Sequence, residues 1–412
     1  MPTESNPQDQ ADDLRDALVA ELVRQGAIRN SAVRDTFATV PRHLFVPQAD
    51  LATAYGDQPV FIRWDAETPI SSSTQPTMMA IMIEQLCLEP GNRVLEIGAG
   101  SGYNAAIMAH IVGDTGNVVT VDIDQDIVDE AAANLSQTGF HNVTCVCGDG
   151  FEGVPTKQPY DRIIVTVGAY DVSPHWVNQL KDGGILVVPL WFRGANLSVA
   201  LRKQGSEITG LSASPCTFIP IRGIWQRTEG YYPVGDPPDE ALQMAIALDS
   251  DDAAYRRELG QVFNQSAELR EIGRSLDGQY YTQNIYSGLF MFLTAHPDVY
   301  NVYSSSESGP FQGAGYGLID LDTMSAAVLS DHYPDKALVY GNDVAYEQLL
   351  DLLEQWDELG HPAIHNLSIR ALYEAPGALS EGEWTIAKRS IYTWVMSWRA
   401  ATATSCSPRS LS

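Results

Sequence analysis

A glycine loop in the first half of the chain has the composition and spacing of a ligand-binding site. The run VLEIGAGSGYNAA (residues 94–106) places Gly98, Gly100 and Gly102 between an expected strand and an expected helix. Because glycine has no Cβ, the backbone there can turn sharply and approach a ligand closely. Similar loops hold the pyrophosphate of dinucleotides, so the loop by itself predicts a nucleotide-like ligand without naming it.

Acidic residues around the loop narrow the choice of ligand. Glu96 precedes the glycines on the same expected strand, where its charge would repel a pyrophosphate and suit a cationic group. Asp122 ends the next expected strand, 24 residues after Gly98, where a carboxylate can accept hydrogen bonds from both ribose hydroxyls. Asp149, in the sequence GDG after a third expected strand, could meet an adenine amino group. S-adenosylmethionine combines an amino acid, a sulfonium, a ribose and an adenine, and we expect it as the cofactor.

Two of these acidic residues also have a purely structural interpretation. Glu96 could be a surface or strand-end carboxylate, and Asp122 could cap a helix. Their order on successive strands favours a common site over two unrelated roles.

Strands and helices alternate along this part of the chain. We expect strands at residues 93–97, 117–123, 143–147, 160–167 and 184–189, and helices at 103–111 and 126–135. Such alternation predicts an α/β fold, a Rossmann-like parallel sheet with helices on both faces. In such folds the ligand lies beyond the carboxyl ends of the strands, where the strand order reverses. The glycine loop and the acidic residues should therefore meet there.

The 412 residues are enough for two or three domains. We expect an N-terminal helical segment at residues 1–50, with Ser31 capping its second helix and a loop-rich passage after it. This segment should pack on an S-adenosylmethionine-binding domain at 51–230. The run GYYPVGDPPD is rich in proline and glycine and marks the boundary to a C-terminal α+β accessory domain at 231–403, followed by a disordered tail at 404–412.

The accessory domain contains less distinctive patterns. We expect a helical stretch at residues 240–276, strands at GYGLIDL and KALVYG, and an amphipathic helix at 343–359. The run WTIAKRSIYTWVMSW fits both the helical and the strand periodicity.

Acidic residues outnumber basic ones, with 52 Asp and Glu against 25 Lys and Arg and a formal charge of −27. That charge repels phosphate backbones and anionic membranes, so we expect no nucleic acid and no membrane among the partners. No run reaches the roughly 18–20 apolar residues that span a bilayer, and the polar first residues do not resemble a signal peptide. Five cysteines are too sparse for a disulfide framework, and no metal-ligand set is complete. We expect a cytoplasmic protein without a metal.

Further motifs resemble the protein L-isoaspartyl (D-aspartyl) O-methyltransferase family. They follow the family order over roughly residues 11–225 and comprise VPRHLFVP (40–47), AYGDQPV (54–60), QPTMMA (75–80), LEIGAGSGYNAA (95–106), GDG (148–150), PYDRIIVTVGA (159–169), QLKDGGILVVP (179–189) and FIPIRG (218–223). The resemblance implies an S-adenosylmethionine-dependent carboxyl O-methyltransferase that releases S-adenosylhomocysteine.

The resemblance also implies a hydroxyl beside the methyl donor and the substrate carboxylate. In the family this is a serine two residues before a proline. Counting back from Pro76, the position is Thr74, with Ser73 as the alternative catalytic residue; the run SSST could also be a plain loop with a helix cap. The residues expected around the donor are Ser72, Gln75, Met79, Glu96, Gly98, Ala99, Gly100, Gly102, Tyr103, Asp122, Ile123, Gly148, Asp149, Gly150 and Thr166.

The chemistry expected at this site is simple. A carboxylate with an ordinary pKa of about 3.9 is ionised at pH 7 and needs no general base. The enzyme must orient the carboxylate toward the methyl group and exclude water, and orientation of this kind can contribute ~7–11 kcal/mol.

The substrate is the least determined part of the interpretation. The SSST spelling and the C-terminal residues after the last motif resemble a longer subgroup associated with ribosomal peptide tailoring (lanthipeptide, graspetide and lasso peptide). Its members methylate an ordinary aspartate in a constrained peptide, and the ester then closes to an aspartimide. We therefore expect a precursor peptide with an aspartate as substrate, and an accessory domain that recognises it or forms a homodimer. The alternatives are an isoaspartate repair methyltransferase and a non-catalytic peptide-binding module.

Overall fold

A computed structural model describes residues 6–192, 194–226, 229–235, 238–247, 253–276, 288–305, 311–330, 332–373, 378–380, 382–386 and 392–400. The chain forms two compact units. The first comprises Met1–Leu190 and Leu197–Arg227, and the second comprises Trp191–Asn196 and Thr228–Ser412. We had expected a boundary between residues 230 and 231, whereas the structure separates the units at 227 and adds a six-residue segment, 191–196, to the second one.

The first unit is built on a sheet whose strands follow the order β9-β8-β7-β6-β3-β4-β5. These strands are β3 (Arg93–Ile97), β4 (Asn117–Asp122), β5 (Val143–Cys147), β6 (Tyr160–Val165), β7 (Leu180–Phe192), β8 (Ala195–Gln204) and β9 (Glu207–Pro215). β3 pairs in parallel with both β4 and β6, and the parallel pairing continues to β5 on one side and β7 on the other. The strand order therefore reverses between β3 and β6, as the alternating pattern predicted.

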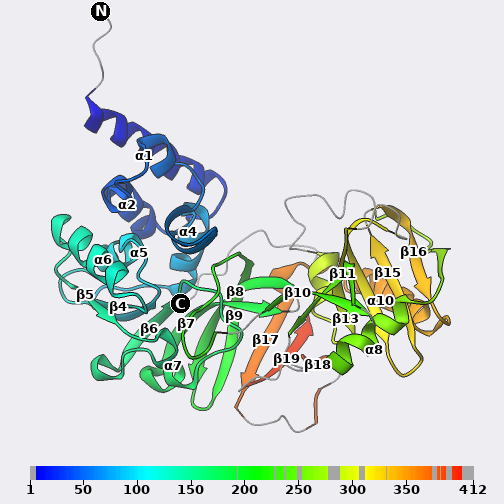
Figure 1. The fold of residues 1–412 in the computed structure, drawn as a ribbon. Coiled ribbons are helices and arrows are strands. Elements are labelled where there is room, and N and C mark those ends of the chain that lie inside the picture. Colours follow the sequence, from blue (N-terminus) through cyan, green and yellow to red (C-terminus); the bar gives the residue numbers. More distant parts are fainter. Residues whose placement is uncertain are drawn as a thin grey trace, which may run out of the picture. The chain divides into compact units, whose positions relative to one another are not determined.

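Helices cover both faces of this sheet. α5 (Tyr103–Val112) and α6 (Gln125–Gln137) lie on one side of β4 and β5, and α7 (Pro174–Gln179) lies on the other side (Figure 1). The strands between them are buried on both faces, because the apolar residues of β3 and β6 have almost no exposed surface. The expected α/β fold with helices on both faces is confirmed.

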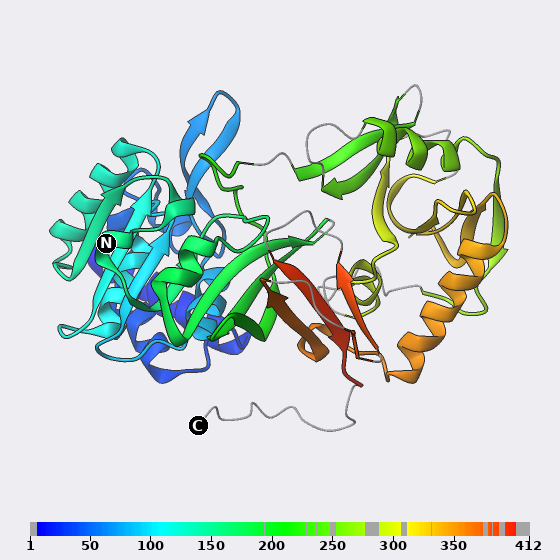
Figure 2. The ribbon, with the colours of Figure 1, turned by 90° about the horizontal axis from the view of Figure 1, so that it is seen from below.

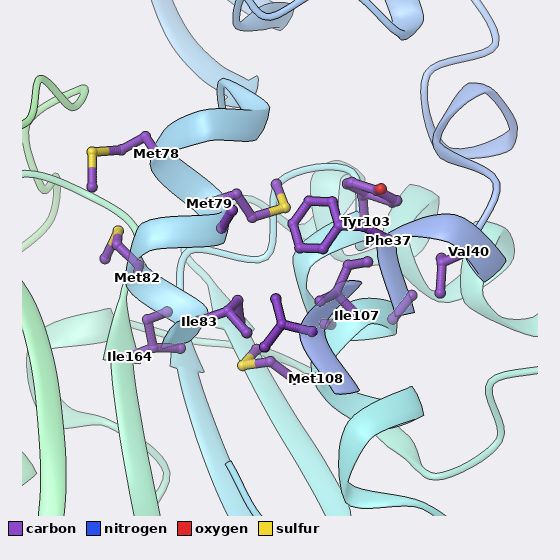
Figure 3. Packing of buried hydrophobic residues seen from close by; sticks show 14 of the residues in the cluster. Phe37, Val40, Met78, Met79, Met82, Ile83, Tyr103, Ile107, Met108 and Ile164 are labelled. Atoms are coloured by element: carbon purple, nitrogen blue, oxygen red, sulfur yellow. The ribbon is translucent and has the colours of Figure 1, made fainter. Parts of the chain in front are cut away.

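The N-terminal helices belong to the first unit. α1 (Pro7–Arg24), α2 (Ser31–Thr39), the short 3-10 helix η1 (Arg42–Phe45) and α3 (Leu51–Ala54) precede the sheet. Their apolar side chains share one core with α4 (Pro76–Leu86) and α5, in which Phe37, Met79 and Tyr103 pack together (Figure 3). The cap of α2 is Asn30, whose side chain accepts a hydrogen bond from Ala32 N at 2.8 Å. The prediction that Ser31 caps this helix was wrong, because the side-chain oxygen of Asn30, one residue earlier, accepts the hydrogen bond from the backbone N–H of Ala32.

A β-hairpin and a helix occupy the passage that we had expected to be loop-rich. β1 (Val60–Asp65) and β2 (Thr68–Ser73) form a two-stranded antiparallel sheet, and α4 begins three residues later. The light-blue hairpin projects from the body of the first unit in Figure 2. Pro76 stands in the first turn of α4, where its fixed φ suits a helix start, so this sequence signal for α4 was overlooked.

The second unit contains two groups of strands. β10 (Glu229–Gly235), β11 (Pro238–Ala247), β12 (Ala267–Glu271), β13 (Val299–Ser304), β14 (Gly313–Asp320), β15 (Ser325–Ser330) and β16 (Tyr333–Tyr340) form a sheet in the order β10-β11-β13-β14-β15-β16-β12. β17 (Leu367–Leu372), β18 (Glu383–Ile386) and β19 (Thr393–Trp398) pair in the order β18-β19-β17. The helices described here are α8 (Ala253–Phe263), α9 (Leu289–Thr294) and α10 (Val344–Glu358).

The predictions for the second unit were correct in part. The amphipathic helix and both strand-like runs are present as α10, β14 and β16. The helical stretch expected at 240–276 is confirmed only for α8; it was wrong near its end, where β12 lies, and over its first residues, which form β11. Its alanine-, leucine- and methionine-rich sequence favours a helix locally, but pairing with β10 and β13 overrides that preference. The expected tail at 404–412 lies outside the described residues.

Within the described ranges, no helix has both the length and the apolar character that crossing a bilayer requires.

Candidate functional site

The glycine loop follows β3 at the point where the strand order reverses. Gly98, Gly100 and Gly102 all have positive φ values, of 100°, 50° and 82°. A Cβ on Gly98 would lie 2.6 Å from Oγ1 of Thr166, and a Cβ on Gly100 would lie 3.1 Å from the carbonyl oxygen of Ser72. The loop is therefore enclosed by the residue after β6 on one side and by the end of the hairpin on the other. Steric exclusion requires glycine at position 98.

Asp122 holds the glycine loop at the end of β4. Its Oδ2 accepts hydrogen bonds from Ala99 N at 3.0 Å and Gly100 N at 3.3 Å. Its Oδ1 accepts a longer bond from Asp124 N at 3.4 Å, and its carbonyl accepts one from Gly148 N at 2.9 Å. Burial raises the pKa of the Asp122 carboxyl even though these N–H groups favour its ionised form. The predicted contact with ribose hydroxyls stays a prediction, and the carboxylate already has a structural role.

Glu96 is completely buried beneath the glycine loop. Its side chain has no exposed surface, so the alternative of a surface carboxylate was wrong. Oε1 accepts a hydrogen bond from Asn104 Nδ2 at 2.7 Å, and the hydroxyl of Thr120, the residue opposite Glu96 on β4, also lowers the pKa of the carboxyl. Burial raises the pKa of Glu96 to about 7. A buried carboxylate that has no cationic partner among the described residues fits a cationic group, such as the ammonium of S-adenosylmethionine.

The sequence GDG follows the end of β5, and its second glycine, Gly150, lies against Ile97 at the end of β3. A Cβ on Gly150 would lie 2.6 Å from Cγ2 of Ile97. Asp149 accepts hydrogen bonds from two backbone N–H groups, with Oδ1 2.9 Å from Phe151 N and Oδ2 2.7 Å from Ile224 N. Asp149 therefore connects this turn to the segment after FIPIRG, and its predicted contact with adenine stays a prediction.

Residues 71–74, Ser-Ser-Ser-Thr, form the end of β2 and the residue after it, and are called the hydroxyl segment below. Ser73 is 3% exposed, and its Oγ has no hydrogen-bond partner among the described residues. Thr74 is half-buried, and the backbone carbonyls of both residues accept hydrogen bonds from the guanidinium of Arg42. Since the carbonyl of Ser72 lies against Gly100, the structure brings this segment beside the glycine loop.

Four other residues that we expected around the methyl donor have contacts outside the glycine loop. Met79 and Tyr103 are buried in the hydrophobic core of the first unit, together with Phe37 (Figure 3). The Gln75 amide donates hydrogen bonds to the carbonyl and to Oδ2 of Asp57, both at 3.2 Å. The Ile123 carbonyl accepts a hydrogen bond from Sγ of Cys147, the last residue of β5, at 3.6 Å. Contacts of these four residues with the donor stay predictions.

Two arginines that the sequence analysis did not select are connected to the site. Arg42 binds the hydroxyl segment, and Arg222 forms an ion pair with Asp124 at the start of α6. Both lie inside quoted motifs, VPRHLFVP and FIPIRG. Their positions in those motifs could have marked both arginines as candidate site residues. Their partners, however, are 31 or more residues away in sequence, and local sequence patterns do not predict such contacts.

The reversed parallel sheet, the glycine loop after β3 and the acidic residue that ends β4 define the fold of S-adenosylmethionine-dependent methyltransferases. The chain belongs to the protein-L-isoaspartate(D-aspartate) O-methyltransferase family, whose sequence model matches residues 13–225. It is thus a member of a family of S-adenosylmethionine-dependent carboxyl O-methyltransferases.

Similar proteins extend this result. The protein-L-isoaspartate O-methyltransferase of Hyperthermus butylicus is 39% identical over 218 residues, which are 51% of this chain and 88% of that protein. The protein of the same name from Methanopyrus kandleri is 40% identical over 214 residues, 51% of this chain and 91% of that protein. A solved structure of a protein-L-isoaspartate O-methyltransferase has a TM-score of 0.51 and 25% identity, covering 88% of this chain and 97% of that chain. The structural match therefore extends beyond the first unit.

Proposed function

We propose that this protein methylates the free carboxylate of isoaspartyl residues in proteins or peptides, with S-adenosylmethionine as donor. One observation carries the proposal: the carbonyl of Ser72 lies against Gly100, so the hydroxyl segment that ends in Thr74 is next to the glycine loop. This proximity supports a donor site at the glycine loop with a carboxylate-binding group next to it. The isoaspartate-specific names of the relatives, which this chain matches over most of their length, support the choice of substrate.

The residues around the glycine loop suit the donor. Glu96 is a buried carboxylate without a cationic partner in the described part of the chain, and Oδ1 of Asp122 accepts, among the same residues, one long hydrogen bond. The three glycines let the loop pack closely against the protein around it, because a Cβ at each position would lie within about 3.2 Å of a protein atom. When bound, S-adenosylmethionine supplies a methyl group carried by a sulfonium.

The protein's own residues have a limited chemical task. A substrate carboxylate is ionised at neutral pH and needs no base. A neutral hydroxyl at Thr74 can orient one carboxylate oxygen without neutralising it, whereas a lysine there would form an ion pair and lower its nucleophilicity. Methylation turns the carboxylate into a better electrophile. The next backbone nitrogen of the substrate can then attack the ester, releasing methanol and closing a five-membered succinimide.

Methylation of an ordinary aspartate in a constrained peptide is the second candidate. The observation that favours it is the threonine at position 74, where the family pattern has serine. The C-terminal residues do not favour it, because the match to a solved isoaspartate methyltransferase covers 88% of this chain. We therefore rank the isoaspartyl substrate first and leave the precursor peptide as the alternative.

Labelled S-adenosylmethionine and two peptides of equal sequence separate these functions. One peptide contains isoaspartate, and the other contains ordinary aspartate, in linear and in cross-linked form. We expect label transfer to the isoaspartyl peptide. Transfer to the cross-linked aspartyl peptide alone would overturn the proposal in favour of peptide tailoring. Donor binding without transfer to any peptide would favour a non-catalytic binding module.

A further inference from the structure

Arg42 is a buried arginine of the first unit. It lies in η1 with no exposed side-chain surface, and no carboxylate in the described part of the chain is within ion-pair distance of it. Burial lowers the pKa of Arg42 to about 10, so the guanidinium is still charged at neutral pH. A buried charge is costly unless another group compensates for it, so Arg42 needs polar partners inside the protein.

The guanidinium is bonded to the hydroxyl segment. One terminal nitrogen donates to the carbonyl of Thr74 at 2.9 Å, and the other donates to the carbonyl of Ser73 at 3.3 Å. The guanidinium carbon lies 5.3 Å from the ring centre of Tyr103, the first residue of α5 after the glycine loop. Arg42 thus contacts both the hydroxyl segment and the helix that follows the glycine loop.

The orientation of the two carbonyls has an electrostatic consequence. In a trans peptide the N–H group points away from the C=O group of the same peptide unit. Because both carbonyls face Arg42, the N–H groups of Thr74 and Gln75 point away from the guanidinium. The positive ends of two peptide dipoles, with a full charge behind them, are therefore directed to the opposite side of the segment. Such an arrangement favours an anion there.

We propose that Arg42 is a positioning residue that holds the Ser73–Thr74 backbone and makes the hydroxyl segment selective for a carboxylate over a neutral group. The inference rests on the proposed function, because the carboxylate is that of the substrate. In a chain with a formal charge of −27, an anionic substrate is repelled at long range. The local charge of Arg42 offsets this repulsion at the point where the carboxylate must bind.

Binding of matched peptides tests the selectivity. The probes are an isoaspartyl peptide and its carboxamide analogue, isoasparaginyl, measured by calorimetry on the full chain saturated with S-adenosylhomocysteine. We expect the wild type to prefer the carboxylate by about tenfold, as is typical of a hydrogen bond to a charged group. Arg42→Met keeps a long unbranched side chain and removes the charge, and it should reduce the preference to about twofold or less. Arg42→Lys keeps the charge and should retain most of the preference.

Arg162 offers a matched control. Its guanidinium also holds two backbone carbonyls, those of Leu86 and Cys87 at the far end of α4. Arg162→Met should leave the carboxylate preference unchanged, although it too removes an arginine that binds carbonyls. An equal loss of preference in Arg162→Met, or an unchanged preference in an Arg42→Met protein that still binds S-adenosylhomocysteine, would overturn the inference.

Two further results keep this test separate from the proposed function. If the wild type methylates aspartyl instead of isoaspartyl peptides, the proposed function fails, and the aspartyl and asparaginyl pair then tests Arg42 in the same way. If Arg42→Met does not fold, Arg42→Lys decides: loss of the carboxylate preference in that charged variant contradicts the inference, and its retention together with a lower kcat supports it.

Discussion

Glu96 and Asp122 are two carboxylates at the carboxyl ends of adjacent strands, in different surroundings. Three backbone N–H groups donate to the side chain of Asp122, which offset part of the cost of its burial. Glu96 receives one amide hydrogen bond, and burial raises its pKa to about 7. Of the two, Glu96 is therefore the residue whose charge should depend on pH near neutrality.

Replacing Glu96 by glutamine should change the pH dependence of stability. Because the folded-state pKa is raised above the ordinary value, the stability that Glu96 contributes is fully present below about pH 4.5 and is lost as the pH rises through about 7. Glu96→Gln should therefore be more stable than the wild type at pH 8, by about 1–3 kcal/mol, and the gain should shrink by pH 5.5. Urea unfolding of the donor-free proteins at both pH values measures this. An equal gain at both would show that Glu96 does not titrate in this range.

Removing the hydroxyl of Thr74 should affect turnover more than donor binding. Thr74→Val keeps the shape of the side chain, and kcat should fall about tenfold or more because a hydrogen bond to a charged group is lost. S-adenosylhomocysteine affinity should be unchanged. Ser73→Ala is the comparison, because the Ser73 hydroxyl is buried without a partner. Loss of turnover in Ser73→Ala with normal turnover in Thr74→Val would move the catalytic role to Ser73.

The elements around the glycine loop are connected by contacts between residues far apart in sequence. The hairpin of β1 and β2 is attached to α6 through Arg63, which pairs with Asp126 at 2.8 Å and Glu130 at 3.0 Å. These partly exposed pairs contribute little to stability. Their effect is to hold the hairpin, whose second strand contains most of the hydroxyl segment, against α6, the helix that follows β4.

An alanine at position 98 should disrupt the loop between β3 and α5. Its Cβ would lie 2.6 Å from Oγ1 of Thr166, and φ is +100°. We expect Gly98→Ala to lower S-adenosylhomocysteine affinity at least tenfold. Gly139→Ala is the matched control, because Gly139 has a φ of +83° with nothing within 4 Å of the added Cβ. It should cost about 1–2 kcal/mol of stability and leave the affinity intact; equal affinity losses in both variants would contradict the steric argument.

At the scale of the whole molecule, the candidate site lies in one unit. All residues expected to contact the donor or the substrate carboxylate fall between 72 and 166, in the first unit. The second unit has its own buried clusters, formed mainly by β13–β16 with α8, α9 and α10. The structural match that covers 88% of this chain shows that a solved relative shares part of this second unit.

A chain that ends at Gln226 tests the role of the second unit. Since the residues expected to bind the donor all lie in the first unit, we expect S-adenosylhomocysteine affinity within about threefold of the full chain, as for a domain that folds by itself. If the second unit recognises the substrate, KM for the peptide should rise at least fivefold. Retained donor binding confirms that the shortened chain is folded, and an unchanged KM would exclude a recognition role for the second unit.

The sequence by itself determined the order of the donor-site residues along the sheet. Short apolar runs that end in glycine or aspartate predicted β3, β4 and β5, because strands buried on both faces need continuous apolar residues. The carboxyl ends of parallel strands meet at one edge, so Gly98, Asp122 and Asp149 could be placed near one another without a structure. Family motifs added Thr74 at its position before Pro76.

Only the tertiary structure decided which groups these residues contact. The bonds from Arg42 to Ser73 and Thr74 span more than 30 residues of sequence, and the burial that raises the pKa of Glu96 exists only in the folded chain, where Asn104 of α5 contacts its carboxylate. The residues of β11 favour a helix locally and become a strand only through pairing with distant strands. Local patterns specify elements and their ends, whereas burial, charge and hydrogen-bond partners depend on residues that the fold brings together.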